Sequence, residues 1–267
     1  MRKLMRFCVP SVVMLGLVAA GCSSSSSSKS SSTTTTTTSK ASGTITVSAA
    51  ASLTEAFTKI GADFKKANPN ATVTFNFGSS GTLATQIQQG APADTFASAD
   101  EDNMNKLATA SLVDGTPVVF AKNKLVIVTK PGNPKNVKTL ADLPNLGTIS
   151  LCGQTVPCGK YAAQILQTAG VTISETKVTR GTDVKTTLAA VTTGDADAAI
   201  VYVTDAESAG NAVDTVTIPD AQNAIATYPI ATLKASTNKA TSQAFIDYVM
   251  SSKGQATLRS FGFLPPS

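Results

Sequence analysis

Short hydrophobic runs alternate with amphipathic segments along residues 44–267, and this alternation predicts a repeated order of strand and helix. One strand is indicated where Val73, Phe75 and Phe77 alternate with polar residues, because the side chains of a strand point in turn to its two faces. Strands are predicted at residues 45–47, 72–77, 93–97, 124–129, 148–151, 198–203 and 230–233. Helices are predicted from residue 52, after residue 81, at 102–109, at 161–169, from residue 182 or 183, and at 241–250. Strands that alternate with helices favour an α/β fold with mixed, mainly parallel sheets flanked by helices.

The helix after the first strand carries a specific start signal. Phe57, Ile60 and Phe64 recur at helical spacing and predict one buried face. Ser52 precedes Glu55 by three residues, which is the spacing of an S-x-x-E capping box. We therefore expect the helix to begin at Ser52, with the two side chains satisfying backbone amides of its first turn.

The first 43 residues differ in character from the rest. A basic start and an apolar run predict an export signal over residues 1–21, since the run is too short for a permanent membrane span. Its end, LVAAGC, resembles a lipobox and predicts that Cys22 is lipidated after cleavage; the alternative is a plain signal peptide with an incidental cysteine. Residues 22–43 are mostly serine and threonine, and so predict a flexible tether that holds the folded part near a membrane face.

Charge and composition exclude several functions. Three of the 22 basic residues lie in the export signal, which leaves 19 against 17 acidic residues and no basic run. This balance gives nucleic-acid binding no support. The chain has no histidine and only two cysteines outside the export region, which argues against a metal site, and a serine hydrolase would lack its usual base. In an exported protein, Cys152 and Cys158 favour a disulfide over two free thiols.

Four turns at predicted helix starts share an unusual chemistry. They contain Ser52, residues 79–81, residues 156–159 and residues 182–184. A helix start leaves backbone N–H groups unpaired and carries partial positive charge, so it is suited to an anion. For any one of these turns taken alone, simple helix capping is the more common explanation. Anion binding is indicated only if several of the turns converge on one point.

Five segments carry a resemblance to a known family. They are ITVSAAASLTEAF, GSSGTLATQIQQGAPADTFASAD, VPCGKYA, AAIVYVTDA and FIDYVMSSKGQATLRSFGF, and together they span nearly all of 44–267. In these segments the chain resembles periplasmic molybdate-binding proteins of ABC transporters. The resemblance implies a two-lobed periplasmic-binding-protein fold of class II with the ligand cleft between the lobes. The first lobe is expected to contain residues 44–122 and 227–267, and the second residues 123–226.

The resemblance also implies which residues bind the oxyanion. Ser52 and Ser80 would each give a hydroxyl and a backbone donor, Cys158 and Val184 a backbone N–H, and Tyr202 its hydroxyl. The protein would contact only the oxygen atoms of the oxyanion; no protein atom would coordinate its metal atom, and no cofactor is implied. The position of Cys158 is often alanine in the family, which does not affect a backbone donor.

Some of these residues have a structural alternative. A tyrosine on a buried strand, such as Tyr202, is more often part of the core. Gly81 stands where some relatives have a third serine, so that contact would be absent. Asp94 is interpreted as structural, and Asp183 beside Val184 leaves an acceptor near the anion possible. The Cys152–Cys158 bridge is expected to rigidify the turn that presents the Cys158 amide.

A site made of donors favours unprotonated dianions, because hydrogenphosphate would need an acceptor for its proton. The expected function is therefore capture of molybdate, and also tungstate, for a membrane permease driven by a cytoplasmic ATPase. The alternative ligand is sulfate or another tetrahedral oxyanion, and the alternative class is an adhesive surface protein. We expect a non-catalytic monomer, lipid-anchored to the outer face of the cytoplasmic membrane.

Overall fold

The structure is a computed structural model, and it describes residues 41–267. The predicted export signal, the lipidation site at Cys22 and almost all of the tether lie outside the described residues. The strands are β1 (Gly43–Ala50), β2 (Ala71–Gly78), β3 (Thr95–Ala97), β4 (Val113–Thr129), β5 (Ile149–Cys152), β6 (Val178–Gly181), β7 (Ala198–Tyr202), β8 (Asp214–Thr217) and β9 (Ile225–Leu233). The α-helices are α1 (Thr54–Ala67), α2 (Ser80–Gln88), α3 (Glu101–Thr109), α4 (Pro157–Thr168), α5 (Val184–Thr192), α6 (Val203–Ala209), α7 (Lys239–Met250) and α8 (Ser252–Ser260). Four short 3₁₀ turns complete the described elements: η1 (Ala51–Leu53), η2 (Leu140–Asn145), η3 (Glu175–Lys177) and η4 (Gly210–Ala212).

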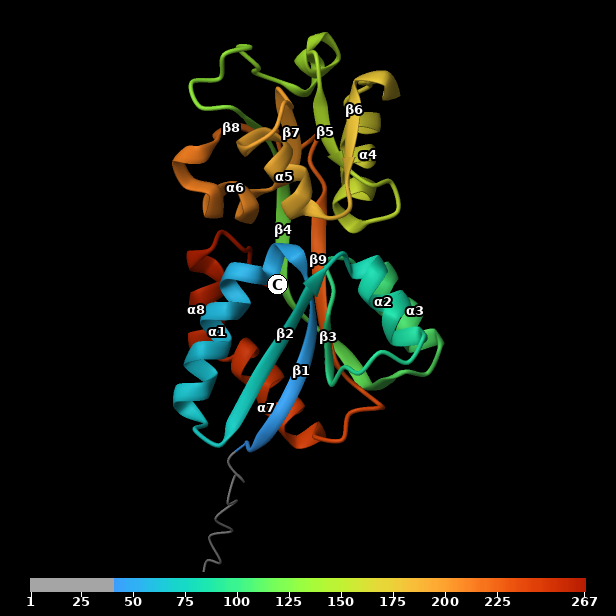
Figure 1. Ribbon diagram of the computed structural model, residues 1–267, viewed down its shortest axis with the longest axis vertical. Helices are drawn as coiled ribbons and strands as arrows, with labels where there is room; N and C mark the ends of the chain where they lie inside the picture. The colour runs from blue at the N-terminus through green and yellow to red at the C-terminus, as the bar shows by residue number, and fades with distance from the viewer. Residues whose placement is uncertain (1–40) are drawn as a thin grey trace, which may run out of the picture. The chain divides into compact units, whose positions relative to one another are not determined.

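The described strands form one sheet in the order β2-β1-β3-β9-β4-β7-β5-β6, with β8 paired to β4. Two long strands, β4 and β9, run antiparallel to each other and connect the two ends of this sheet (Figure 1). On one side of them β1 pairs in parallel with β2 and β3; on the other, β5 pairs in parallel with β6 and β7. The expected two-lobed α/β fold is confirmed.

We call β1, β2, β3, α1, α2, α3, α7 and α8 the first lobe, and β5, β6, β7, β8, α4, α5 and α6 the second lobe. In the first lobe, helices cover both faces of the sheet (Figure 1). On one face Phe57 of α1 packs against the rings of Phe75, Phe120 and Phe245. On the other face α2 and α3 cover a separate buried cluster that includes Phe96. Burial of these aromatic groups stabilises the lobe, because it removes apolar area from water.

The sequence pattern located most elements but misplaced some boundaries. The capping box expected at Ser52 and Glu55 is wrong: residues 51–53 form the 3₁₀ turn η1 and α1 begins at Thr54. Both side chains have tertiary partners instead, the Ser52 hydroxyl with Tyr228 and the Glu55 carboxylate with Lys185. Helix α4 begins at Pro157 rather than residue 161, and β4 begins at Val113 rather than residue 124. Helix α8 was not predicted, because only Gly254 and Leu258 are buried along it.

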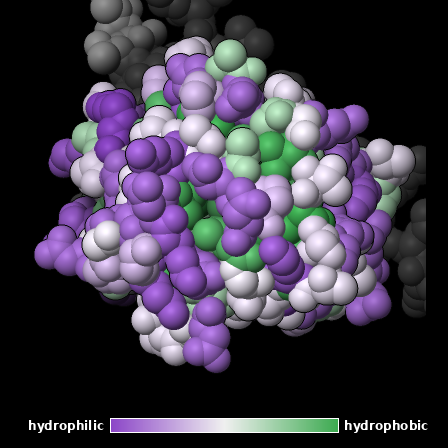
Figure 2. Space-filling model, turned by 90° about the horizontal axis from the view of Figure 1, so that it is seen from above, coloured by the Kyte–Doolittle hydropathy of each residue, from purple (hydrophilic) through white to green (hydrophobic). Residues whose placement is uncertain are grey.

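The surface of the described residues is largely polar. Figure 2 looks down on the molecule from above the view of Figure 1 and shows mainly hydrophilic residues, with hydrophobic residues visible in the gaps between them. Only Val118 and Ile225 are large hydrophobic side chains that are exposed among residues 41–267. Within the same residues, no helix has both the length and the hydrophobicity that a membrane span requires.

Candidate functional site

A small cavity of about 20 Å³ lies where the two lobes meet. Its walls consist of residues from both lobes, mostly small or hydroxyl-bearing: Ala50, Ala51, Ser52, Gly78, Ser79, Ser80, Ala99, Val156, Pro157, Cys158, Asp183, Val184 and Tyr202. Sites for organic ligands usually measure several hundred Å³. The size therefore suits a small inorganic ion rather than an organic substrate.

All five residues that the resemblance implied line this one cavity. Ser52 lies in η1 after β1, Ser80 is the first residue of α2, and Cys158 lies in the first turn of α4. Val184 is the first residue of α5, and Tyr202 is the last residue of β7. The first two come from the first lobe and the other three from the second lobe. Each of the five is at most 3% exposed, so the structure brings them together in a buried place between the lobes.

Helix starts surround the cavity with backbone donors. Helices α2, α4 and α5 begin at its wall, and the first amides of a helix have no intrahelical acceptor. At α5 the Asp183 carboxylate caps the helix by accepting from the Thr186 amide at 2.8 Å; the sequence alone leaves the start open between residues 182 and 183. That cap leaves the amides of Val184 and Lys185 for a ligand. Three positive helix ends facing one point favour an anion there.

Four of the residues that line this cavity carry hydroxyl groups. The Ser80 hydroxyl accepts a hydrogen bond from the Ala99 amide at 3.0 Å, which leaves its proton free to be donated. The Ser52 hydroxyl is 2.9 Å from that of Tyr228. The hydroxyls of Tyr202 and Ser79 are buried without a hydrogen-bond partner. An unpaired buried polar group costs about 1–3 kcal/mol, so both are suited to a ligand that accepts hydrogen bonds.

Two of these contributions were not expected from the sequence. Ser79 lies in the GSSG motif, but only Ser80 was assigned there; only the structure shows that Ser79 precedes α2 without capping it. Tyr228 lies just before the strand predicted at residues 230–233, and no role was expected for it from the sequence. Asp94 is structural as expected, because its carboxylate accepts from the Thr46 amide and the Ser236 hydroxyl.

The electrostatics of the cavity rest on dipoles rather than on full positive charges. Among the described residues that line it, none is a lysine or arginine. Burial raises the pKa of Tyr202 well above its ordinary value, so this hydroxyl keeps its proton and remains a donor. Within residues 41–267, no group of three or more histidine, cysteine, aspartate and glutamate side chains is placed to hold a metal ion.

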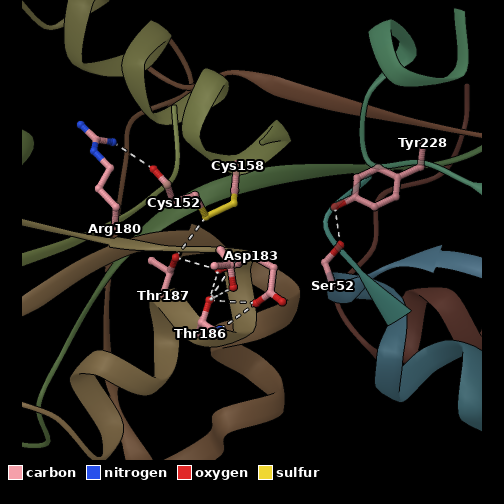
Figure 3. Close-up of a disulfide and its surroundings, with 9 residues drawn as sticks. Ser52, Cys152, Cys158, Arg180, Asp183, Thr186, Thr187 and Tyr228 are labelled. Atoms are coloured by element: carbon pink, nitrogen blue, oxygen red, sulfur yellow. Dashed lines mark hydrogen bonds between the residues drawn. A yellow bond between two sulfur atoms is a disulfide. The ribbon is translucent and has the colours of Figure 1, made fainter. Parts of the chain in front are cut away.

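A disulfide joins Cys152 at the end of β5 to Cys158 in the first turn of α4 (Figure 3). The Arg180 guanidinium donates to the Cys152 carbonyl at 2.9 Å, and the Thr187 hydroxyl to the Cys152 sulfur at 3.2 Å. The turn that presents the Cys158 amide is thus tied covalently to the sheet and by hydrogen bonds to β6 and α5.

Two lysines of the second lobe make ion pairs with the first lobe beside the cavity. Lys185, which follows Val184, bonds to Glu55 of α1 at 2.8 Å and lies 3.1 Å from the buried Asp205 of its own lobe. Lys160 of α4 lies 2.9 Å from Asp102 and 3.4 Å from Asp100. The cavity therefore lies close to charge pairs that connect its two walls, and neither lysine lines it.

A family model for bacterial extracellular solute-binding proteins matches residues 45–264. The chain belongs to this family. Among extracellular solute-binding proteins, the molybdate-binding protein ModA of Mycobacterium tuberculosis is 40% identical over 259 residues, which are 97% of this chain and 96% of that protein. The molybdate-binding protein ModA of Escherichia coli is 34% identical over 231 residues, 83% of this chain and 89% of that protein.

A solved structure supports the same fold. The periplasmic molybdate-binding protein of Azotobacter vinelandii matches with a TM-score of 0.76 and 22% identity, over 84% of this chain and 100% of that chain. At this level of identity the match concerns the fold alone. The family resemblance carried by the AAASL and GAPAD segments is confirmed by the relatives above 30% identity.

Proposed function

We propose that this solute-binding protein captures molybdate, and also tungstate, by hydrogen bonds alone and delivers it to an ABC importer. The observation that carries the proposal is the meeting of Ser52, Ser80, Cys158, Val184 and Tyr202 in one buried, ion-sized cavity. The ligand identity is supported by the molybdate-binding relatives that cover almost the whole chain.

A buried dianion must recover in the site the hydration that it loses. Hydrogen bonds to a charged partner contribute roughly 1.5–3 kcal/mol each, so several donors fixed in place can hold the ion without a lysine or arginine. The two serine hydroxyls, the Tyr202 hydroxyl and the amides of the helix starts supply these donors. The protein makes and breaks no bond in this function.

The two lobes supply different parts of the donor set, so binding is coupled to their closure. We propose that residues 44–122 and 227–267 form one rigid lobe and residues 123–226 the other, with a hinge in β4 and β9. Closure on the ion would present one compact surface to the permease, whose cytoplasmic ATPase drives import. The largely polar surface of the described residues supports a monomer.

We further propose that the protein is held at the outer face of the cytoplasmic membrane by a lipid on Cys22. The small residues before this cysteine and the Ser/Thr-rich stretch after it support the proposal. A lipid anchor would keep the protein within reach of the permease without a spanning helix.

Calorimetric titration of the folded protein tests the ligand. We expect tight binding of molybdate and tungstate. Hydrogenphosphate should bind at least about a hundredfold more weakly, because the cavity offers donors and little acceptor capacity for its proton. Sulfate should also bind more weakly, because this dianion is smaller and reaches the fixed donors less well. A preference for sulfate would replace molybdate with the smaller dianion as the ligand. No binding of any tetrahedral dianion would refute the proposed function.

A further inference from the structure

Tyr228 lies behind Ser52, outside the wall of the cavity. Its ring is fully buried between the rings of Phe120, Phe263 and Tyr202, so its position is fixed by packing. It lies on β9, where that strand pairs with β4 between the two lobes. Its hydroxyl is 2.9 Å from the Ser52 hydroxyl, and Figure 3 shows the two groups pointing toward each other.

The direction of this hydrogen bond follows from the residue on its other side. The side-chain oxygen Oδ1 of Asn123 accepts from the backbone amide of Lys124 at 2.9 Å, which turns the side-chain amino group of Asn123 toward Tyr228 and Thr204. The amino group is a donor only, so at 3.4 Å it offers the Tyr228 oxygen a proton. Burial raises the pKa of Tyr228, which therefore keeps its own proton and has the Ser52 oxygen to give it to.

Ser52 is left with a proton that needs an acceptor. Among the described residues its hydroxyl makes one side-chain hydrogen bond, to Tyr228. With Tyr228 as the donor, the Ser52 oxygen is the acceptor in this bond. Its proton then turns toward the cavity, where an oxyanion can accept it. The Ser80 hydroxyl is held in a similar way: its oxygen accepts from the Ala99 amide, which leaves its proton to be donated.

We infer that Tyr228, oriented by Asn123, is a positioning residue that makes Ser52 a donor to the anion. The inference rests on the proposed function. It also bears on specificity. The Ser52 oxygen already accepts a hydrogen bond and its proton faces the ion, so this serine disfavours binding of a protonated oxyanion. Such a ligand would bring its own O–H against a donor, an arrangement that disfavours the wrong partner.

A double-mutant cycle separates this role from packing. Tyr228→Phe keeps the ring and removes the hydroxyl, and we expect it to weaken molybdate binding about tenfold, as loss of one oriented donor would. In the Ser52→Ala background the same change should weaken binding less than about twofold, because the serine through which Tyr228 acts is gone. Tyr248→Phe is the matched control: it lies on α7 against Phe64, and should leave the affinity unchanged.

Two further measurements complete the test. Asn123→Leu, which keeps the size but not the donor, should weaken binding in the same direction and remains informative if Tyr228→Phe folds poorly. In competition titrations, Tyr228→Phe should reduce the ratio of the affinity for molybdate to the affinity for hydrogenarsenate. The Ser52 oxygen then becomes free to accept the proton of hydrogenarsenate.

The inference would be wrong if the losses of molybdate-binding free energy from Tyr228→Phe and Ser52→Ala simply added in the double variant. It would also be wrong if Tyr228→Phe left the molybdate affinity unchanged, or left the ratio of the molybdate and hydrogenarsenate affinities unchanged. Failure of the unmodified protein to bind any tetrahedral dianion would instead refute the proposed function, so the two failures are distinguishable.

Discussion

Asp205 is a fully buried carboxyl in the second lobe, and burial raises its pKa to about 6. Lys185 opposes this shift, while Glu55 and Asp183 reinforce it. The folded protein thus holds the Asp205 proton up to about pH 6, whereas the unfolded chain releases it near the ordinary value of 3.8. The contribution of this group to the free energy of unfolding therefore falls as pH rises from about 4 to 6.

Replacing the ionised carboxyl by a neutral amide should remove this pH dependence. We expect Asp205→Asn to raise the free energy of unfolding by up to about 3 kcal/mol at pH 8 and to leave it unchanged below about pH 4. Urea unfolding of the anion-free protein at a series of pH values measures the difference. If the difference in free energy of unfolding between Asp205→Asn and the unmodified protein were the same at pH 4 and at pH 8, the assignment of the shift to Asp205 would be wrong.

At the scale of elements, the disulfide connects β5 to the helix start that presents the Cys158 amide. We expect the double replacement Cys152→Ala, Cys158→Ala to lower the free energy of unfolding by about 2 kcal/mol, the loop-closure contribution of so short a loop. Molybdate affinity should change by less than about threefold, because the donor at this position belongs to the backbone.

Thermal unfolding and calorimetric titration of the same samples measure the two quantities, with the reduced unmodified protein as the control. If affinity collapsed while stability held, the role of Cys158 as a backbone donor would be wrong. If mass spectrometry found both thiols free in native protein, the disulfide would be absent and this prediction would be wrong.

At the scale of the whole molecule, charges from the two lobes lie in contact, and the proposed closure would form these contacts. Glu55 is the first-lobe partner of Lys185, and removing it leaves the Lys185–Asp205 pair within the second lobe intact. We expect Glu55→Gln to weaken molybdate binding about threefold at low salt and less at high salt, because exposed ion pairs contribute little and are screened.

Calorimetric titration at two ionic strengths checks this expectation. Asp63→Asn is the matched control, since Asp63 pairs with Lys59 and Lys66 within α1 and joins no lobes. An equal effect of Asp63→Asn would show that the loss follows surface charge in general and not the contact between the lobes.

Local signals in the sequence were enough for features that depend on neighbouring residues. The α/β order of elements follows from hydrophobic periodicity, and the sequence placed the start of α5 at residue 182 or 183, of which Asp183 is the observed cap. The same reasoning failed at Ser52 and Glu55. Their spacing matched a capping box, but partners distant in sequence, Tyr228 and Lys185, bind them instead.

The sequence by itself determined which helix starts carry small, donor-rich residues, that histidine is absent, and that two cysteines are close enough to pair. Only the tertiary structure decided that those helix starts meet at one cavity, and that Tyr228 stands behind Ser52 across 176 positions. The physical reason is the separation in sequence over which each interaction acts. Caps and amphipathic faces are set within a few residues, whereas convergence and the direction of a buried hydrogen bond depend on how β4 and β9 bring the two lobes together.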